Sequence, residues 1–361
     1  MNGFSKQRRL SRREVLRAAG LASGGLLFGG ALAACGDGSS SGGSASAEPG
    51  KVVLGVYGGP QQPVYENYVA KAMRESGAEV TLVLATGGAR INTIYAEKGQ
   101  PSMDVAMLAV PDALTAVADG VVEKLDPKVP HADEIEDFAK EGGYMVSGFT
   151  LGLGYNPDKI DKPTSFEDLW NPDYKGHIAV PDPGKNANGT TFIAMLTKMY
   201  ADGNYASNDK VWDKLKELRP NVVLQYSSEN DVNELWEQQD IWLAVRSSAF
   251  TWQFQKAAPN VKVDFITPKE GAALMGNVAT IPVGAPNADL ARDAIGHMLD
   301  EPFQKEFAED QFFLPTRKDI TLSPDTQAKM PKVDEVQSLP WGEIGKTRAQ
   351  WVDRWTREMS G

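Results

Sequence analysis

Two stretches of the chain alternate short apolar segments with turns and amphipathic segments, and this alternation restricts the possible folds more than any other feature. In the first stretch, strands are predicted at residues 52–57, 79–85 and 104–109, and helices at 64–76, 89–98 and 111–119. In the second, strands are predicted at 177–180, 222–226, 241–245 and 261–266, and helices at 190–200, 208–218, 230–239 and 249–257. Strands that alternate with helices at this interval are joined by crossovers, so they form parallel sheets with helices on both faces. The pattern predicts an α/β fold.

Two extended segments connect the two α/β regions. Residues 148–155 lie between the regions and residues 278–283 follow the second one. Two strand-like links between two lobes predict a two-stranded hinge, with a ligand cleft between the lobes where the carboxyl ends of the strands meet. The predicted boundaries are 51–150 for the first lobe, 151–280 for the second, and 281–361 for a return segment with C-terminal helices that complete the lobes. In that tail, Trp341, Trp351 and Trp355 are placed to cap a lobe.

The first 34 residues read as an export signal. Arg12 and Arg13 lie in a segment that resembles a twin-arginine motif, and an apolar, glycine- and alanine-rich stretch follows. It ends on Leu-Ala-Ala before Cys35, which resembles the site where a bacterial lipoprotein signal is cleaved and the new N-terminal cysteine is lipidated. We therefore expect a signal peptide over 1–34, a lipid anchor at Cys35, a flexible linker over 35–50 and a location outside the cytoplasmic membrane.

Composition excludes several classes of function. Cys35 is the only cysteine and the three histidines are far apart, so disulfides, thiolate chemistry, metal sites and cofactors are not expected. No phosphate-binding loop and no nucleophile elbow is present. The net charge is −11, and because the leader holds six basic residues and one acidic residue, the rest of the chain carries about −16. This balance argues against a nucleic-acid partner.

Several motifs occur in an order that is similar to one family. The fragments are TGGARINTIYAE from Thr86, MDV from Met103, DGVV from Asp119, PTSFEDLW from Pro163, YKG from Tyr174, PKEGA from Pro268, IP from Ile281 and PTR from Pro315. The chain from about 51 to 320 resembles the solute-binding proteins of ABC importers, in the group that binds ferric ion, thiamine, phosphonates or spermidine and putrescine. The resemblance implies a type II periplasmic-binding-protein fold, a monomer that captures a small solute and delivers it to a membrane permease and its ATPase, and no catalysis.

The resemblance also bears on the solute. Residues 247–252 lack the adjacent tyrosines of the ferric binders, which disfavours iron. Met275 and Asn277 stand where the polyamine binders place a tryptophan and an aspartate, and Ala109 stands where a serine is expected. A buried ammonium without a carboxylate is costly, and only Asp182, Glu229 and Asp231 offer themselves as anchors. A polyamine remains the alternative solute.

The remaining features favour an organic anion or a zwitterion. Thr86-Gly87-Gly88 and the segment from Asn188 to Thr191 each open a predicted helix, and helix N-termini bind carboxylates and phosphates. Arg246 follows a strand and is a candidate for a bidentate pair with the anion. The predicted ligand-binding residues are Tyr57, Gly58, Thr86, Gly87, Gly88, Ala109, Asp182, Gly189, Thr190, Tyr226, Ser227, Arg246 and Asn277. Two other functions stay open: a secreted enzyme on the same scaffold, which needs an acid–base pair, and a surface adhesion or sensor lipoprotein.

Overall fold

The computed structural model describes residues 50–332 and 335–359, which lie in one compact unit. The predicted signal peptide, the lipidation site at Cys35 and the predicted linker up to residue 49 are outside the described residues. Within the described ranges, no helix is both long enough and apolar enough to cross a membrane.

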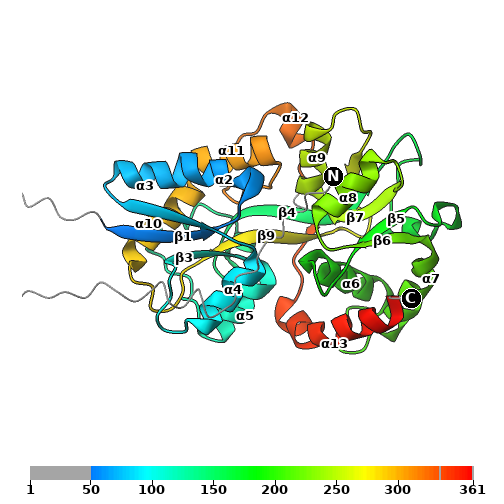
Figure 1. Ribbon diagram of the computed structural model, residues 1–361, viewed down its shortest axis with the longest axis horizontal. Coiled ribbons are helices and arrows are strands. Elements are labelled where there is room, and N and C mark those ends of the chain that lie inside the picture. The colour runs from blue at the N-terminus through cyan, green and yellow to red at the C-terminus, as the bar shows by residue number, and fades with distance from the viewer. Residues whose placement is uncertain (1–49, 333–334, 360–361) are drawn as a thin grey trace, which may run out of the picture. The chain divides into compact units, whose positions relative to one another are not determined.

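The strands form one sheet in the order β2-β1-β3-β9-β4-β7-β5-β6, with β10 beside β9 and β8 beside β4 (Figure 1). Their bounds are β1 (Lys51–Val56), β2 (Glu79–Leu84), β3 (Val105–Ala109), β4 (Tyr144–Tyr155), β5 (Ile178–Pro181), β6 (Val222–Tyr226), β7 (Leu243–Ser247), β8 (Asp264–Ile266), β9 (Ala272–Thr280) and β10 (Val336–Gln337).

The sheet is parallel within each lobe and antiparallel where the lobes join. Strands β1, β2 and β3 pair in parallel, as do β5, β6 and β7, which the alternating pattern predicted. The prediction was wrong for β8, which pairs antiparallel with β4 and not with the second parallel group. Strands β4 and β9 are antiparallel to each other and to their neighbours β7 and β3. The two predicted links are thus longer strands than the pattern indicated, and the predicted boundary at residue 150 falls inside β4.

Strand β4 is buried along almost its whole length, which explains why its sequence shows no alternation of polar and apolar residues. The glycines of β4 occur at positions where side chains of neighbouring elements approach the strand closely. A Cβ at Gly154 would lie 2.8 Å from the ring of Trp236. We infer that the glycines that interrupt this segment in the sequence serve packing inside a strand.

The helices cover both faces of the sheet (Figure 1). The α-helices are α2 (Gln62–Val64), α3 (Lys71–Glu75), α4 (Gly87–Ala96), α5 (Val110–Ala118), α6 (Ala187–Tyr200), α7 (Asp209–Leu218), α8 (Glu229–Glu237), α9 (Ser248–Ala257), α10 (Ala288–Leu299), α11 (Glu301–Gln311), α12 (Pro324–Gln327) and α13 (Trp341–Met359). The helical segments of other types are η1 (Gly59–Gln61), the π-helical η2 (Tyr65–Ala70), η3 (Asp137–Lys140), η4 (Phe166–Trp170), η5 (Pro172–Tyr174) and η6 (Arg219–Asn221).

Most predicted helices are present, with shifted ends. The helix predicted at 64–76 is present as three consecutive segments, α2, η2 and α3, of which the middle one is π-helical. Helix α6 begins before the predicted position because Asn186 caps it, its side-chain oxygen accepting from Asn188 N at 2.9 Å. Strand β8 is three residues shorter than predicted because Val261 N donates to Ala258 O in a turn.

Two lobes are defined by the elements that pack on each group of parallel strands. Lobe 1 consists of β1–β3 with η2, α3, α4, α5, α10 and α11, and lobe 2 consists of β5–β7 with α6–α9. Helix α13 contacts α6 and α7 of lobe 2 and also α5 of lobe 1. The three tryptophans of the tail, Trp341, Trp351 and Trp355, are buried on this helix, as their predicted capping role requires.

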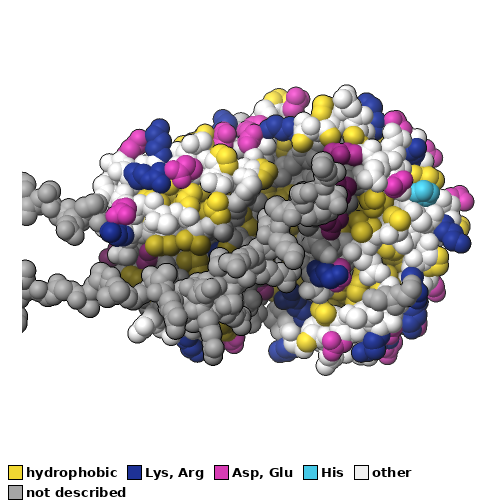
Figure 2. Space-filling model, viewed as in Figure 1, with side chains coloured by type: hydrophobic (Ala, Val, Ile, Leu, Met, Phe, Trp, Pro, Cys, Tyr) yellow, Lys and Arg dark blue, Asp and Glu magenta, His cyan; other side chains and the backbone are white. Residues whose placement is uncertain are grey.

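Charged side chains of both signs are interspersed on the face drawn in Figure 2. Lys and Arg side chains lie beside Asp and Glu around the described part of that face, without a stripe of one sign.

Candidate solute-binding cleft

The strand directions place the carboxyl ends of both parallel groups opposite each other. Strand β4 begins beside β9 in the part of the sheet next to lobe 1 and ends beside β7 of lobe 2. Because β3 is antiparallel to β9 and β7 is antiparallel to β4, β3 runs toward lobe 2 and β7 runs toward lobe 1. The loops that follow these strands therefore converge between the lobes, where open α/β sheets bind ligands.

A small cavity of about 30 Å³ lies at this convergence. It is bounded by the first turn of α5 from lobe 1, the first turn of α6 from lobe 2, and one side of α13. Its lining residues are Ala109, Pro111, Asp112, Ala187, Thr190, Ile344, Gly345 and Arg348. Two of the predicted ligand-binding residues, Ala109 and Thr190, are thus brought together from opposite lobes.

Asp112 and Arg348 give the cavity one group of each charge. The closest nitrogen of Arg348 and oxygen of Asp112 are 3.8 Å apart, and the side chains are 46% and 28% exposed. Burial raises the pKa of the Asp112 carboxyl above its usual value, and the Arg348 charge only partly opposes this rise. The carboxylate is therefore incompletely compensated.

Thr190 contributes a hydroxyl with no partner. The residue is 4% exposed, and no hydrogen-bond partner for its Oγ1 occurs among the described residues. The neighbouring Thr191 differs, because its hydroxyl donates to Ala187 O at 3.2 Å within the helix. A buried hydroxyl without a partner costs free energy unless a ligand or water completes it.

The lobe 1 residues of the prediction lie around the loops after β1 and β2. Tyr57 follows β1, and the guanidinium of Arg90 lies 4.1 Å from the centre of its ring. Burial raises the pKa of the Tyr57 hydroxyl, and the charge of Arg90 only partly opposes this rise. Thr86 caps α4 by accepting from Ala89 N at 3.2 Å.

The buried side chain of Arg90 holds these loops in place through hydrogen bonds to the main chain. It is 1% exposed and donates to the main-chain oxygens of Val56, Ala85 and Met107. It thereby ties the ends of β1 and β3 to the loop after β2. Gly58 lies in the loop after β1, and Gly87 and Gly88 are the first two residues of α4, after the capping residue Thr86.

Three predicted residues of lobe 2 are engaged in the turns after β5 and β6. Asp182 accepts from Gly184 N at 2.8 Å and pairs with Lys185 at 3.1 Å. A Cβ at Gly189 would lie 2.4 Å from the nitrogen of Pro183, so glycine is required there by close packing of α6 on the turn. Ser227 N donates to the carboxylate of Asp231, which caps α8.

Tyr226 and Arg246 lie inside lobe 2 and are not brought to the cavity. Tyr226 is fully buried, and its hydroxyl donates to Val245 O at 2.9 Å. Arg246 is 1% exposed and its Nε donates to a carboxylate oxygen of Glu229 at 2.6 Å. Its guanidinium also lies 4.7 Å from the centre of the Trp236 ring. The charge that was predicted to meet an anion is matched within the lobe.

Asn277 stands on the central strand β9, opposite Ala109 of β3 and Ser147 of β4. Its amide nitrogen donates to the Ser147 hydroxyl at 3.0 Å, and the residue is 6% exposed. This bond holds β4 and β9 together at the junction of the lobes. That Asn277 binds the solute stays a prediction, and the same holds for the other predicted ligand-binding residues.

The two residues that give the cavity its charges were not singled out from the sequence. Asp112 lies three positions after the end of a predicted strand, in the first turn of the next helix, and this position was a usable signal. Arg348 gave no such signal, because it lies in a tail that was expected only to cap a lobe. The three carboxylates that were considered as ammonium anchors are all engaged elsewhere: Asp182, Glu229 and Asp231.

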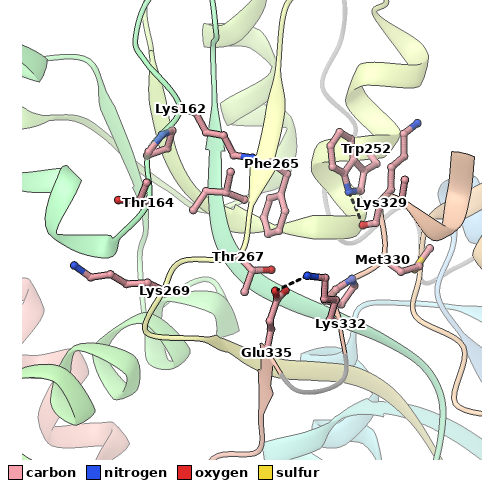
Figure 3. Close-up of a pocket in the computed structure, with 14 residues that line it drawn as sticks. Lys162, Thr164, Trp252, Phe265, Thr267, Lys269, Lys329, Met330, Lys332 and Glu335 are labelled. Carbon is pink, nitrogen blue, oxygen red and sulfur yellow. Dashed lines mark hydrogen bonds and ion pairs between the residues drawn. The ribbon is translucent and has the colours of Figure 1, made fainter.

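A second and larger hollow of about 390 Å³ lies on a different part of the molecule (Figure 3). Trp252 and Phe265 supply aromatic surface, and Lys162, Lys269, Lys329 and Lys332 surround it with one acidic residue, Glu335. Lys332 is paired with Glu335 at 3.6 Å. None of its lining residues directly follows a parallel strand of either lobe, so this lysine groove is not the cleft that the strand directions define.

Comparison with known proteins agrees with this geometry. Residues 67–332 match the family described as bacterial extracellular solute-binding protein. The chain is 23% identical over 289 residues to a Salmonella typhimurium protein named "Putative 2-aminoethylphosphonate-binding periplasmic protein", covering 78% of this chain and 83% of the relative. It is 30% identical over 223 residues to the spermidine/putrescine-binding periplasmic protein of Escherichia coli, covering 58% and 61%.

A solved structure extends the likeness over most of the chain. The crystal structure of an ABC transporter protein from Clostridium perfringens superposes with a TM-score of 0.74 at 26% identity, covering 86% of this chain and all of that one. The relatives are binding proteins and not enzymes. The chain therefore belongs to the bacterial extracellular solute-binding proteins, which capture small solutes for ABC importers.

Proposed function

We propose that this protein is the lipid-anchored binding component of an ABC importer for a small organic anion or zwitterion. In this proposal the twin-arginine signal directs export, Cys35 carries the lipid, and the two lobes close on the solute before they deliver it to the permease. The protein acts as a monomer, and the solute lies at the convergence of β3, α5, α6 and α13.

The observation that carries the proposal is the unpartnered hydroxyl of Thr190 in the first turn of α6, between the lobes. The N-terminus of a helix carries a partial positive charge, which together with a free hydroxyl favours an anionic group. Arg348 adds a positive charge on the same cavity. The relative that is named for a phosphonate carrying an amine supports this solute class.

A polyamine is the second candidate, and one observation favours it. Asp112 supplies a carboxylate in the cleft that the sequence alone did not indicate, so the protein is not without an anchor for an ammonium group. The Escherichia coli relative is named for spermidine and putrescine. Arg348 opposes this candidate, because it sets a positive charge 3.8 Å from the only carboxylate of the described cavity lining.

A thermal-shift screen of the exported domain, residues 50–361, tests the function. A solute at a hundredfold excess over its Kd stabilises the native state by roughly 2.7 kcal/mol. We expect organic anions or zwitterions to raise the Tm and small-angle scattering to show a more compact particle with the same compounds. A rise with spermidine alone would favour the second candidate. A rigid particle that responds to no compound of either class would contradict the importer role.

The anchor is tested separately on the full-length chain. We expect membrane fractionation of the wild type and solubility of a Cys35→Ala variant. If the variant fractionates with membranes as the wild type does, the lipid anchor at Cys35 is refuted while solute binding is unaffected.

A further inference from the structure

We propose that the cleft selects a zwitterion, with Asp112 holding the ammonium group of the solute and Arg348, together with Thr190, holding its anionic group. The proposal rests on the proposed function and narrows its solute class. It assigns a binding role to Arg348, a residue of the C-terminal helix.

Asp112 is suited to an ammonium group because its present partner is a weak one. An Arg–carboxylate pair at hydrogen-bond distance is usually 2.7–2.9 Å long, whereas the separation here is 3.8 Å. Asp112 also lies in the first turn of α5, on the lining of the cavity. Its negative charge is only partly compensated by Arg348, and a primary ammonium would compensate it further.

The anionic group of the solute has two side-chain donors. Thr190 offers its unpartnered hydroxyl, and Arg348 offers a guanidinium that is 46% exposed. Unlike Arg246, Arg348 is not committed to a buried carboxylate. Both poles of a short zwitterion therefore find complementary groups within one cavity.

Helix α13 packs on α6 and α7 of lobe 2 and on α5 of lobe 1, so the position of Arg348 is fixed by the fold. Near the end of the helix, Trp355 Nε1 donates to the side chain of Gln225 at 2.7 Å. Arg354 donates to Asp209 at 2.5 Å, and its guanidinium lies 5.0 Å from the centre of the Trp212 ring. Arg348 lies two turns before these contacts, and its ion pair with Asp112 reaches lobe 1. Arg348 and Asp112 thus lie on two helices, α13 and α5, that pack on each other where the lobes meet.

The cavity between Asp112 and Arg348 is small, with a volume of about 30 Å³. In the proposal, these two side chains move apart when the solute enters. A zwitterion replaces their contact with two shorter ones, and so compensates for its loss on closure.

Calorimetric titration of residues 50–361 with matched compounds tests the proposal. The zwitterions are 2-aminoethylphosphonate, β-alanine and 4-aminobutyrate; the amine-free acids are ethylphosphonate, propionate and butyrate; the diamine is putrescine. We expect at least one zwitterion to bind, and its amine-free acid and putrescine to bind roughly tenfold to a hundredfold more weakly, the factor that a charge-assisted hydrogen bond supplies.

Two variants test the binding of the ammonium group and of the anionic group separately. Asp112→Asn should weaken the zwitterion by the same factor and leave the amine-free acid unchanged. Arg348→Ala should weaken both the zwitterion and the acid, without weakening putrescine. Asp293→Asn and Arg357→Ala, which change exposed residues on α10 and α13, are the controls and should bind as the wild type does.

Several results would overturn the proposal. They are equal affinity of the parent for a zwitterion and its amine-free acid, preference for putrescine, no binding of any zwitterion, or unchanged zwitterion affinity in both cleft variants. Tight binding of an acid or a diamine with lobe closure would remove the zwitterion assignment and leave the importer role intact. Far-ultraviolet circular dichroism of each variant establishes that it is folded.

Discussion

Two arginine–carboxylate pairs, one inside lobe 2 and one at the cavity between the lobes, differ in length and in burial. Arg246 and Glu229 are 2.6 Å apart with side chains 1% and 15% exposed, inside lobe 2. Arg348 and Asp112 are 3.8 Å apart, more exposed, and belong to α13 and lobe 1. The first pair joins β7 to α8 within one lobe, whereas the second spans the cleft.

The difference between the two pairs indicates which of them a bound solute can replace. Glu229 is deeply buried, and burial raises the pKa of its carboxyl while Arg246 lowers it, so each charge depends on the other. Removing either partner leaves an isolated charge in the interior. The pair between α13 and lobe 1 is long and partly exposed, so a solute can replace it at little cost. The inner pair therefore stabilises the fold, and the outer pair is available for binding.

The largest expected effect is on the stability of lobe 2. Arg246→Ala should lower the free energy of unfolding by about 3–5 kcal/mol, because Glu229 is left buried without its partner. Arg348→Ala should change it by less than about 1 kcal/mol, as for a solvent-exposed pair. Urea denaturation of the solute-free protein measures both.

A double-mutant cycle that combines Arg246→Ala with Glu229→Gln measures the interaction between Arg246 and Glu229. The double variant should lose less stability than the sum of the two single variants, because the second change removes a charge that was already unpaired. Equal losses in Arg246→Ala and Arg348→Ala would abolish the distinction between the two pairs.

The next effect is a pH dependence with opposite signs for stability and binding. Because burial raises the folded-state pKa of Asp112 above its unfolded value, the stability that this group contributes is fully present below the unfolded pKa and is lost as pH rises through the folded pKa. At neutral pH, Asp112→Asn should therefore stabilise the solute-free protein slightly while weakening zwitterion binding.

The measurement is the urea midpoint of parent and variant between acid and neutral pH. The difference should be positive at neutral pH and vanish in acid, below the unfolded pKa of about 3.9 for an aspartate. Zwitterion affinity of the parent should fall as the pH decreases toward the pKa of Asp112, with a shallower fall in the variant. An Asp112→Asn protein that is less stable than the parent at neutral pH would contradict the uncompensated carboxylate.

The smallest expected effect concerns Thr190. Thr190→Val removes an unpartnered hydroxyl, so solute-free stability should stay level or rise by up to about 1 kcal/mol, while zwitterion affinity falls roughly twofold to tenfold. Thr197→Val is the matched control on the same helix. Its hydroxyl donates to Ile193 O and accepts from Asn208, so that change should reduce stability without altering affinity. The reverse pattern would place the solute away from α6.

Much of the fold could be predicted because its signals are local. The strands β1, β2 and β3 and the helices between them follow from short apolar runs and helical spacing, and the family and its binding activity followed from ordered motifs. The length of β4 and its place in a single mixed sheet did not, because a strand that is buried on both faces has no alternating pattern.

The site was harder to predict because its residues are distant in sequence. Ala109 and Thr190 meet at the cavity as the strand-end rule indicates. Arg246 also follows that rule, yet its pairing with Glu229 depends on how α8 packs against β7, which no local pattern reports. Arg348 lies more than two hundred positions after Asp112, and only the path of α13 back to lobe 1 brings them together.

The most direct test of the zwitterion cleft is a crystal structure of residues 50–361 with 2-aminoethylphosphonate. We predict electron density between α5 and α6, with the amine nitrogen at hydrogen-bond distance from the Asp112 carboxylate and the phosphonate against Thr190 Oγ1 and Arg348. Density for the compound in the lysine groove of Figure 3 alone, or between the lobes with its phosphonate turned toward Asp112, would contradict the account.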